Sequence, residues 1–224
     1  MKQMEIGWLG YTIDNADYIP GNEYHDQSSD SGNREWCSGS MNITAANVPD
    51  NTNISYFTDA QWSQLGPYMK NANIFWCKAS RLLIQESDGT HPLARTVSMN
   101  GWMGYTNWDW EGQPYVLFHK TSDITGMSTS DAFVFMDERD DSVDDGYFCV
   151  DMQMDWIANV PSNYHYGNGT VTFADGHAEI HKWTTPEFQI AQPSGLTSTS
   201  SKFFTVAANN SDMLWLRTHA SYHQ

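Results

Sequence analysis

The segment from residue 170 to residue 183 constrains the fold more than any other, because a turn signal stands between two strand-like runs. The turn signal is Asp175-Gly176, a pair that favours the positive φ angles of a two-residue type I′ turn. In that geometry Ala174 lies opposite His177 on the following strand. The pattern therefore predicts a β-hairpin, and with it an antiparallel sheet.

The register of this hairpin decides which side chains reach the core, since side chains alternate between the two faces of a strand. The predicted core face carries Val171, Phe173, Ala178 and Ile180. The predicted opposite face carries Thr172, Ala174, His177, Glu179, His181 and Trp183. Only the first set is uniformly apolar, so we expect Phe173 to be buried and Thr172 to lie outside the core.

A helix is predicted over residues 1–17, where apolar residues recur at helical spacing. One stripe consists of Met1, Met4, Trp8 and Tyr11, and a neighbouring stripe consists of Ile6, Leu9, Ile13 and Ala16. Turn residues at Pro20-Gly21-Asn22 end the helix. Because no capping residue precedes it, we expect the chain to be a truncated ectodomain whose gene encodes a membrane-length apolar segment upstream.

Local signals predict several shorter elements. A capping box at residues 58–61 predicts a short helix that ends at Gly66-Pro67. Strands are expected over residues 74–77, 132–136 and 147–152, and a last short helix over residues 213–218. A long irregular region separates the first helix from most of these strands.

Composition limits the classes of partner. The 224 residues carry a formal net charge of -16, which repels nucleic-acid phosphates and anionic lipid head groups and attracts divalent cations. No apolar run is long enough to span a bilayer. The cysteines Cys37, Cys77 and Cys149 lack C-x-x-C spacing, and leave open either one Cys37–Cys77 disulfide or free buried thiols.

Several segments together resemble a known family. His165, followed after nine residues by Asp175-Gly176, matches the H-X9-DG motif of prepilin-type proteins abundant in Planctomycetes and Verrucomicrobia. Four further stretches are typical of that group: residues 65–68 (LGPY), 97–102 (VSMNGW), 135–148 (FMDERDDSVDDGYF) and 173–183 (FADGHAEIHKW). The start of the chain, from Lys2 to Asn15, resembles the end of the long pilin helix. The chain thus resembles a bacterial pseudopilin of the type II secretion kind along nearly its whole length.

The resemblance implies an α+β, pilin-like fold in which an N-terminal helix packs on an antiparallel β-sheet with a long irregular insertion. One ectodomain would span residues 1–224, with 1–17 as the remnant of the long helix, 22–95 as the variable insertion and 96–224 as the β-rich part. The implied location is extracytoplasmic, at an inner membrane to which the missing helix anchors the protein. The implied partners are other pseudopilin or secretion-system subunits.

The chain departs from the family pattern in two places. The hydrophobic N-terminal segment is absent. A Cys-Pro-Ala-Asp run that is common in the family appears here as Cys77-Lys78-Ala79-Ser80. The second change removes the proline and the carboxylate that this run has elsewhere.

An acidic segment over residues 137–146 is a candidate calcium site, because hard cations take six to eight oxygen ligands. The candidate ligands are Asp137, Asp141, Asp144 and Asp145. The resemblance supports calcium, since major pseudopilins hold this ion in a late loop. The EF-hand template does not fit, because its third and twelfth positions would be Val143 and Met152. The alternative is a solvated acidic loop without an ion.

His177, Glu179 and His181 alternate on one predicted strand face and form a second candidate metal site. Neighbouring members stand about 7 Å apart, so one transition metal ion could not bind both histidines. His165 could join from across the sheet. The alternative is a polar sheet face, and Asp175 is explained by its role in the turn.

An aromatic cluster over residues 95–125 provides a candidate glycan site. Trp102, Trp108 and Trp110, with Tyr105 and Tyr115, could stack on sugar rings. Asp109 and Glu111 could act as a carboxylate pair for glycoside hydrolysis. Glu179 and His177 would join them if this segment folds over the hairpin. The alternative is that the tryptophans fill a thin core under a long loop.

The sequence favours a structural or binding subunit of a secretion-like assembly, with calcium as the one cofactor that it suggests. A glycan-binding or glycoside-hydrolysing protein on the same scaffold is the first alternative, and a metal-dependent hydrolase is the second. We expect no efficient catalysis, because carboxylates in a polar loop should ionise normally.

Overall fold

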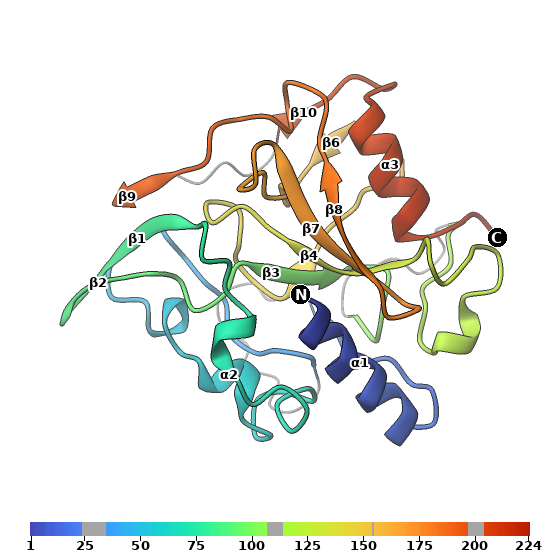
Figure 1. Cartoon of the computed structure of the whole chain (residues 1–224), viewed down its shortest axis with the longest axis horizontal. Helices are drawn as coiled ribbons and strands as arrows, with labels where there is room; N and C mark the ends of the chain where they lie inside the picture. The colour runs from blue at the N-terminus through green and yellow to red at the C-terminus, as the bar shows by residue number, and fades with distance from the viewer. Residues whose placement is uncertain (24–34, 107–113, 154, 197–203) are drawn as a thin grey trace.

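The computed structural model describes residues 1–23, 35–106, 114–153, 155–196 and 204–224. The fold is a mixed α+β arrangement in which strands outnumber helices (Figure 1). Among the described residues, no helix has the length and apolar character needed to cross a bilayer.

The largest sheet has five strands in the order β5-β3-β4-β7-β8. Their bounds are β3 Val97–Asn100, β4 Phe133–Asp137, β5 Tyr147–Phe148, β7 Asn168–Phe173 and β8 Ala178–Lys182. All neighbouring pairs are antiparallel except β3 and β5, which are parallel. The strand expected over residues 132–136 is confirmed as β4.

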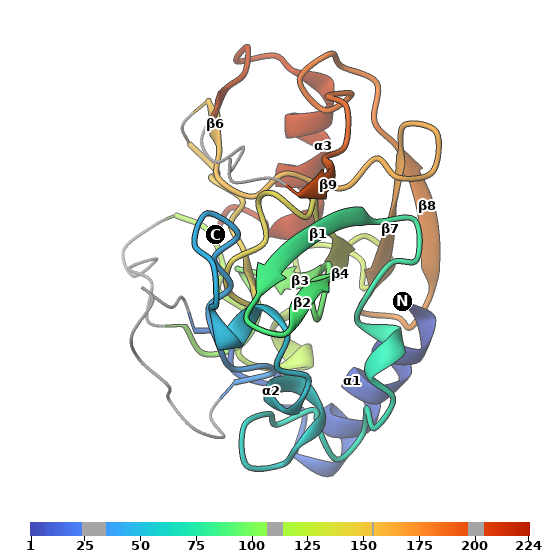
Figure 2. The same cartoon turned by 90° about the vertical axis from the view of Figure 1, so that its left-hand side faces the viewer.

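Two smaller sheets lie beside this one. Their strands are β1 Arg81–Glu86, β2 Gly89–His91 and β9 Ser194–Leu196 in one sheet, and β6 Trp156–Ile157 and β10 Phe204–Thr205 in the other. Figure 2 shows β1 and β2 crossing in front of β3 and β4. A small apolar core that contains Leu82, Ile84 and Val143 joins β1 to the acidic segment.

Three α-helices and three short 3₁₀ helices complete the described elements. They are α1 Lys2–Asp14, α2 Ser55–Thr58, α3 Ser211–Ala220, η1 Pro49–Asn51, η2 Ala72–Ile74 and η3 Thr121–Asp123. The predicted N-terminal helix is therefore confirmed, although it ends earlier than expected. Ala16 and Asp17 follow it with positive φ angles of 53° and 66°, a conformation that does not continue a helix.

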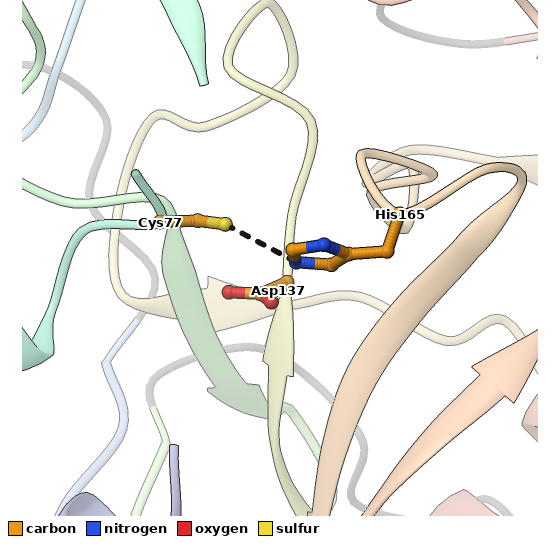
Figure 3. Close-up of side chains that lie close together, drawn as sticks. All are labelled: Cys77, Asp137 and His165. Carbon is orange, nitrogen blue, oxygen red and sulfur yellow. Dashed lines mark hydrogen bonds between the residues drawn. The ribbon is translucent and has the colours of Figure 1, made fainter. Parts of the chain in front are cut away.

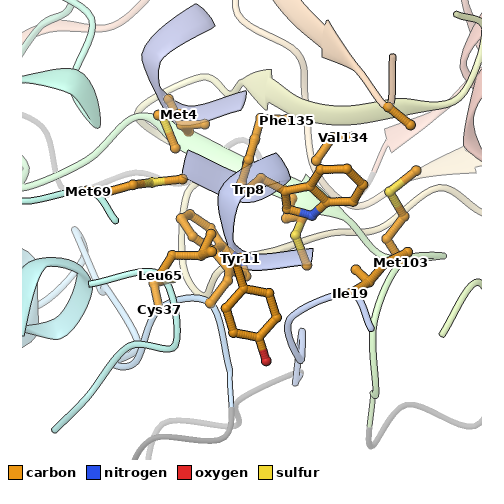
Figure 4. Close-up of a cluster of buried hydrophobic side chains, with 14 of the residues drawn as sticks. Met4, Trp8, Tyr11, Ile19, Cys37, Leu65, Met69, Met103, Val134 and Phe135 are labelled. Atoms are coloured by element: carbon orange, nitrogen blue, oxygen red, sulfur yellow. The ribbon is translucent and has the colours of Figure 1, made fainter. Parts of the chain in front are cut away.

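The side chains of α1 and α3 belong to two different hydrophobic cores. Met4 and Trp8 of α1 share one core with Val134 and Phe135 of β4 (Figure 4). Members of the second core include Phe133, Met136, Phe173, Met213 and Leu216. Strand β4 therefore contributes to apolar cores on both faces, which is why it is buried at every position.

The hairpin forms, but its predicted register is wrong by one residue. Its loop has three residues, Ala174 to Gly176, and Gly176 has a φ of 95°. A three-residue loop that ends in the left-handed region is a standard alternative to the type I′ turn. Phe173, and not Ala174, pairs with His177, because the Ala174 N–H donates to the Ala132 carbonyl instead.

This shift changes which side chains share a face. Thr172 now lies opposite Ala178, and Val171 lies opposite Glu179. Phe173 and Val171 are buried as predicted, but Ile180 is 67% exposed and Thr172 is completely buried. The expectation that Thr172 lies outside the core is therefore wrong.

Thr172 is buried because it repairs a β-bulge. One extra residue of β4 lies between the pairs Phe133–Phe173 and Met136–Val171, and a bulge of this kind interrupts the hydrogen-bond ladder. The Thr172 hydroxyl accepts a 3.1 Å hydrogen bond from the Phe135 N–H, which lies in the bulged stretch. The side chain thus replaces a missing main-chain acceptor.

We expect Thr172→Ala to lower the free energy of unfolding by about 1–3 kcal/mol, because it leaves a buried N–H without its acceptor. Thr172→Ser keeps the hydroxyl and should therefore lower the free energy of unfolding clearly less. Urea denaturation of both variants measures the difference. A Thr172→Ala variant as stable as the serine variant would show that the bulge does not need this acceptor.

Three shorter elements also differ from the predictions. Helix α2 ends at Thr58, where the capping box was expected to begin a helix, and residues 59–67 form turns. The segment 74–77 is the end of η2 and a turn, not a strand. Strand β5 covers only two of the six residues expected over 147–152.

Candidate functional site

Three side chains with metal-binding or nucleophilic chemistry meet beside β4: Cys77, Asp137 and His165. One ligand atom from each lies within 4.8 Å of the other two. The Cys77 Sγ and His165 Nε2 atoms are 3.5 Å apart. Figure 3 shows the Cys77 sulfur and the Asp137 carboxylate on the same side of the His165 imidazole ring. Asp137 is buried, whereas Cys77 and His165 are half-buried.

Cys77 is held by its own main chain. It lies in the turn after η2, and its N–H donates to the Thr96 hydroxyl at 2.9 Å. Thr96 in turn donates its N–H to the Phe75 carbonyl at 2.8 Å. Thr96, which directly precedes β3, therefore fixes the turn that carries the Cys77 thiol.

Asp137 is the last residue of β4, and its position is set by neighbours on two sides. It pairs with Val97 of β3, and its carbonyl accepts a 2.8 Å hydrogen bond from the Ser162 N–H. Strand geometry therefore fixes the direction of its side chain.

His165 lies in the tight turn that leads into β7. Its N–H donates to the Asn168 carbonyl at 3.2 Å, and the Asn168 amide donates back to the His165 carbonyl. Tyr166 and Gly167 follow with positive φ angles of 56° and 85°. This local network orients the imidazole toward the end of β4.

Asp140 connects the two segments that carry Cys77 and His165. Its carboxylate accepts a hydrogen bond of 2.6 Å from the Ser80 hydroxyl and another from the Tyr164 hydroxyl. Ser80 lies three residues after Cys77, and Tyr164 directly precedes His165. The buried Asp140 carboxylate thus fixes both the segment that carries Cys77 and the segment that carries His165.

The electrostatics around the site reflect a concentration of buried acids. Burial raises the pKa of Asp137 to about 6, although hydrogen bonds from Thr170 and the nearby His165 lower it in part. Burial likewise raises the pKa of Glu138 to about 7 and of Asp140 to about 6. Burial also raises the pKa of Cys77, and the negative charge of Asp137 adds to the effect. The buried carboxyl groups around the site are therefore stabilised when they bind a proton or lie beside another cation.

The acidic segment does not behave as a solvated loop. Glu138 is fully buried and accepts hydrogen bonds from the hydroxyls of Ser98 and Ser142 and from the Asn159 amide. Of the six acidic residues in the segment, only Asp144 is not buried. The expectation that the carboxylates of this segment ionise normally is wrong for Asp137, Glu138 and Asp140, because burial raises their pKa values.

The four proposed calcium ligands are directed to different partners. Asp141 forms a two-pronged ion pair with Arg139 at 2.9 and 2.8 Å. Asp145 accepts the Tyr147 N–H at 2.9 Å, and Asp144 faces the Asn159 amide at 3.5 Å. Asp137 alone joins a cluster of potential ligands among the described residues, and its neighbours there are sulfur and nitrogen donors.

His177, Glu179 and His181 do lie on one face of the hairpin, but each has a different neighbour. The His177 ring bonds to Asp175 at 2.6 Å and stacks on Phe173. The His181 ring stacks on Trp215 of α3, with centroids 3.8 Å apart, and burial lowers its pKa. A carboxylate oxygen of Glu179 lies 3.8 Å from the His181 Nδ1 atom, and the Glu179 side chain is 44% exposed. This face is mainly a packing surface for α3.

The candidate glycan site is only partly described. Trp102 is completely buried, and its indole N–H donates to the Val150 carbonyl, so it is a core residue. Tyr115 packs edge-on against it. Trp108, Trp110, Asp109 and Glu111 lie outside the described residues.

Sequence reasoning identified the members of the Cys77–Asp137–His165 cluster separately but did not place them together. His165 stood out as the start of the H-X9-DG motif, Asp137 as a calcium ligand and Cys77 as a possible disulfide partner of Cys37. All three cysteines are free thiols in the structure. The available signals were the H-X9-DG motif for His165 and, for Cys77, the cysteine that this chain keeps where the family has a Cys-Pro-Ala-Asp run.

Comparison with known proteins adds no relative: no family model, no curated protein and no solved structure matches this chain.

Proposed function

We propose that this protein is a pseudopilin-like structural subunit of an extracytoplasmic, type II secretion-like assembly. The observation that carries the proposal is the location of the family-like segments. Residues 97–102, 135–148 and 165–183 together supply β3, β5, β7, β8 and most of β4. The family-like segments therefore build most of the five-stranded sheet, while the helices and the two smaller sheets lie outside these segments.

The outward surface of α1 supports a role in assembly. Met4 and Trp8 are buried, whereas Ile6 and Ile13 are 59% and 76% exposed. Residues seven apart lie on the same face of a helix, so the two isoleucines form an apolar strip on the outside of α1. Such a strip provides a contact for a neighbouring subunit of an assembly built around N-terminal helices.

A photo-crosslinking amino acid at Ile13 tests this proposal when the protein is expressed from its own gene in the source bacterium. We expect cross-links to a second copy, or to another prepilin-type protein identified by mass spectrometry, in the inner-membrane fraction. The same amino acid at exposed Thr218 on α3 is the matched control and should give no such product. Protein found only in the cytosol, or equal products at both positions, would contradict the proposal.

A further inference from the structure

We propose that Cys77, Asp137 and His165 form a binding site for one divalent transition-metal ion, with zinc as the preferred occupant. The site draws on three separate parts of the chain: the turn after η2, the end of β4 and the turn before β7. One ligand atom from each of the three side chains lies within 4.8 Å of the other two.

The donor atoms select the metal. Thiolate sulfur, imidazole nitrogen and carboxylate oxygen are the usual ligands of protein-bound zinc, whereas calcium and magnesium take oxygen ligands. Tetrahedral zinc with bonds of about 2.0–2.3 Å keeps its ligand atoms about 3.5 Å apart. The Cys77 Sγ to His165 Nε2 separation of 3.5 Å matches this spacing.

The site is held in place by residues that do not bind the metal. Asp140 links Ser80 to Tyr164, and thereby fixes the segments that carry the cysteine and the histidine. Asp137 is fixed by the sheet itself. Groups that orient metal ligands in this way typically raise metal affinity 10- to 100-fold.

The same three side chains fit catalysis by a thiol less well. In a relay, the carboxylate bonds to the imidazole nitrogen that faces away from the nucleophile. Here the Asp137 carboxylate lies on the same side of the ring as the Cys77 sulfur (Figure 3). Convergence on one point is the geometry of metal ligation.

Three protein ligands leave a fourth tetrahedral position for water or an external ligand. The half-buried Cys77 and His165 place this position within reach of solvent. A bound ion would also tie the turn at Cys77 to the central sheet. We therefore expect metal binding to raise the melting temperature.

Metal titration of chelator-treated, reduced protein tests the proposal. We expect one equivalent of Zn²⁺ to bind, with no comparable binding of Ca²⁺ or Mg²⁺. Co²⁺ should produce a thiolate-to-metal charge-transfer band together with a tetrahedral visible spectrum. Cys77→Ser and His165→Ala should each weaken Zn²⁺ binding by about 100-fold or more, and Asp140→Asn by about 10-fold. Circular dichroism verifies folding of each variant.

Matched controls distinguish this site from other thiols and histidines. Cys149→Ser and His177→Ala remove a half-buried cysteine and a partly exposed histidine outside the cluster, and should leave Zn²⁺ affinity unchanged. Unchanged binding in the folded double variant Cys77→Ser, His165→Ala would overturn the proposal, as would a cobalt spectrum without the thiolate band. If Cys77→Ser does not fold, the cobalt spectrum of the unmodified protein decides alone.

Discussion

Phe173→Ala is expected to lower the free energy of unfolding by about 3–5 kcal/mol, because truncating a buried phenylalanine removes its packing and leaves a cavity. The ring is 2% exposed and stacks on His177 with centroids 4.3 Å apart. It also packs edge-on against Trp215 and His219 of α3. Its loss therefore weakens the contact between the hairpin and α3. Chemical denaturation measures the change.

Ile180→Ala is the matched control for the hairpin register. If the hairpin had the predicted two-residue turn, Ile180 would share the core face with Phe173. The Ile180→Ala variant would then lower the free energy of unfolding substantially. In the structure the side chain is 67% exposed, so we expect a change within about 0.5 kcal/mol. A loss comparable with that of Phe173→Ala would contradict the three-residue loop.

Glu5→Gln is expected to raise the free energy of unfolding at pH 7 by about 2–3 kcal/mol. Glu5 is completely buried under β7, and neither carboxyl oxygen has a hydrogen-bond partner among the described residues. Burial raises the pKa of Glu5 to about 8, and the negative charge of Asp175 acts in the same direction. The nearby Thr172 hydroxyl lowers this pKa in part, although the two groups do not meet the geometry of a hydrogen bond. The folded state must therefore keep a proton that the unfolded state releases, which costs about 1.4 kcal/mol per pH unit.

The sign of the pH dependence follows from this raised pKa. The stability contributed by protonated Glu5 is fully present below its ordinary pKa of 4.5, declines as the pH rises, and is lost above about 8. The glutamine variant should therefore remove part of the decline in stability between pH 5 and 8. Asp131→Asn, at an exposed position, is the control and should leave the profile unchanged. An identical profile for Glu5→Gln and the unmodified protein would show that Glu5 is solvated.

Structural features that depend only on residues close together in the sequence could be predicted from the sequence. Apolar spacing located α1 and the burial of Met4, Trp8 and Tyr11, because helical periodicity is a property of the chain itself. A run of apolar residues located β4, and Asp175-Gly176 located the hairpin turn. The α+β class was therefore accessible from local pattern and turn chemistry.

Which side chains of a strand point into the core depended on the elements that pack against each of its faces. Alternation of polar and apolar residues predicts a core face only when the other face meets water. Strand β7 faces the second apolar core on one side and helix α1 on the other, so Thr172 became buried and the polar–apolar pattern gave the wrong register. The hydrogen bond from the Ala174 N–H to the carbonyl of Ala132, which directly precedes β4, fixed the three-residue loop.

The candidate site was decided entirely by tertiary structure. The acidic segment resembled a solvated loop, but hydroxyl and amide groups from distant segments bury Glu138 and Asp140. Cys77, Asp137 and His165 lie far apart in the chain, and no spacing rule relates them. They meet because the order of strands places the end of β4 beside the turns that precede β1 and β7. Sequence determined which groups could bind a metal, whereas strand pairing and the buried Asp140 determined that these three converge.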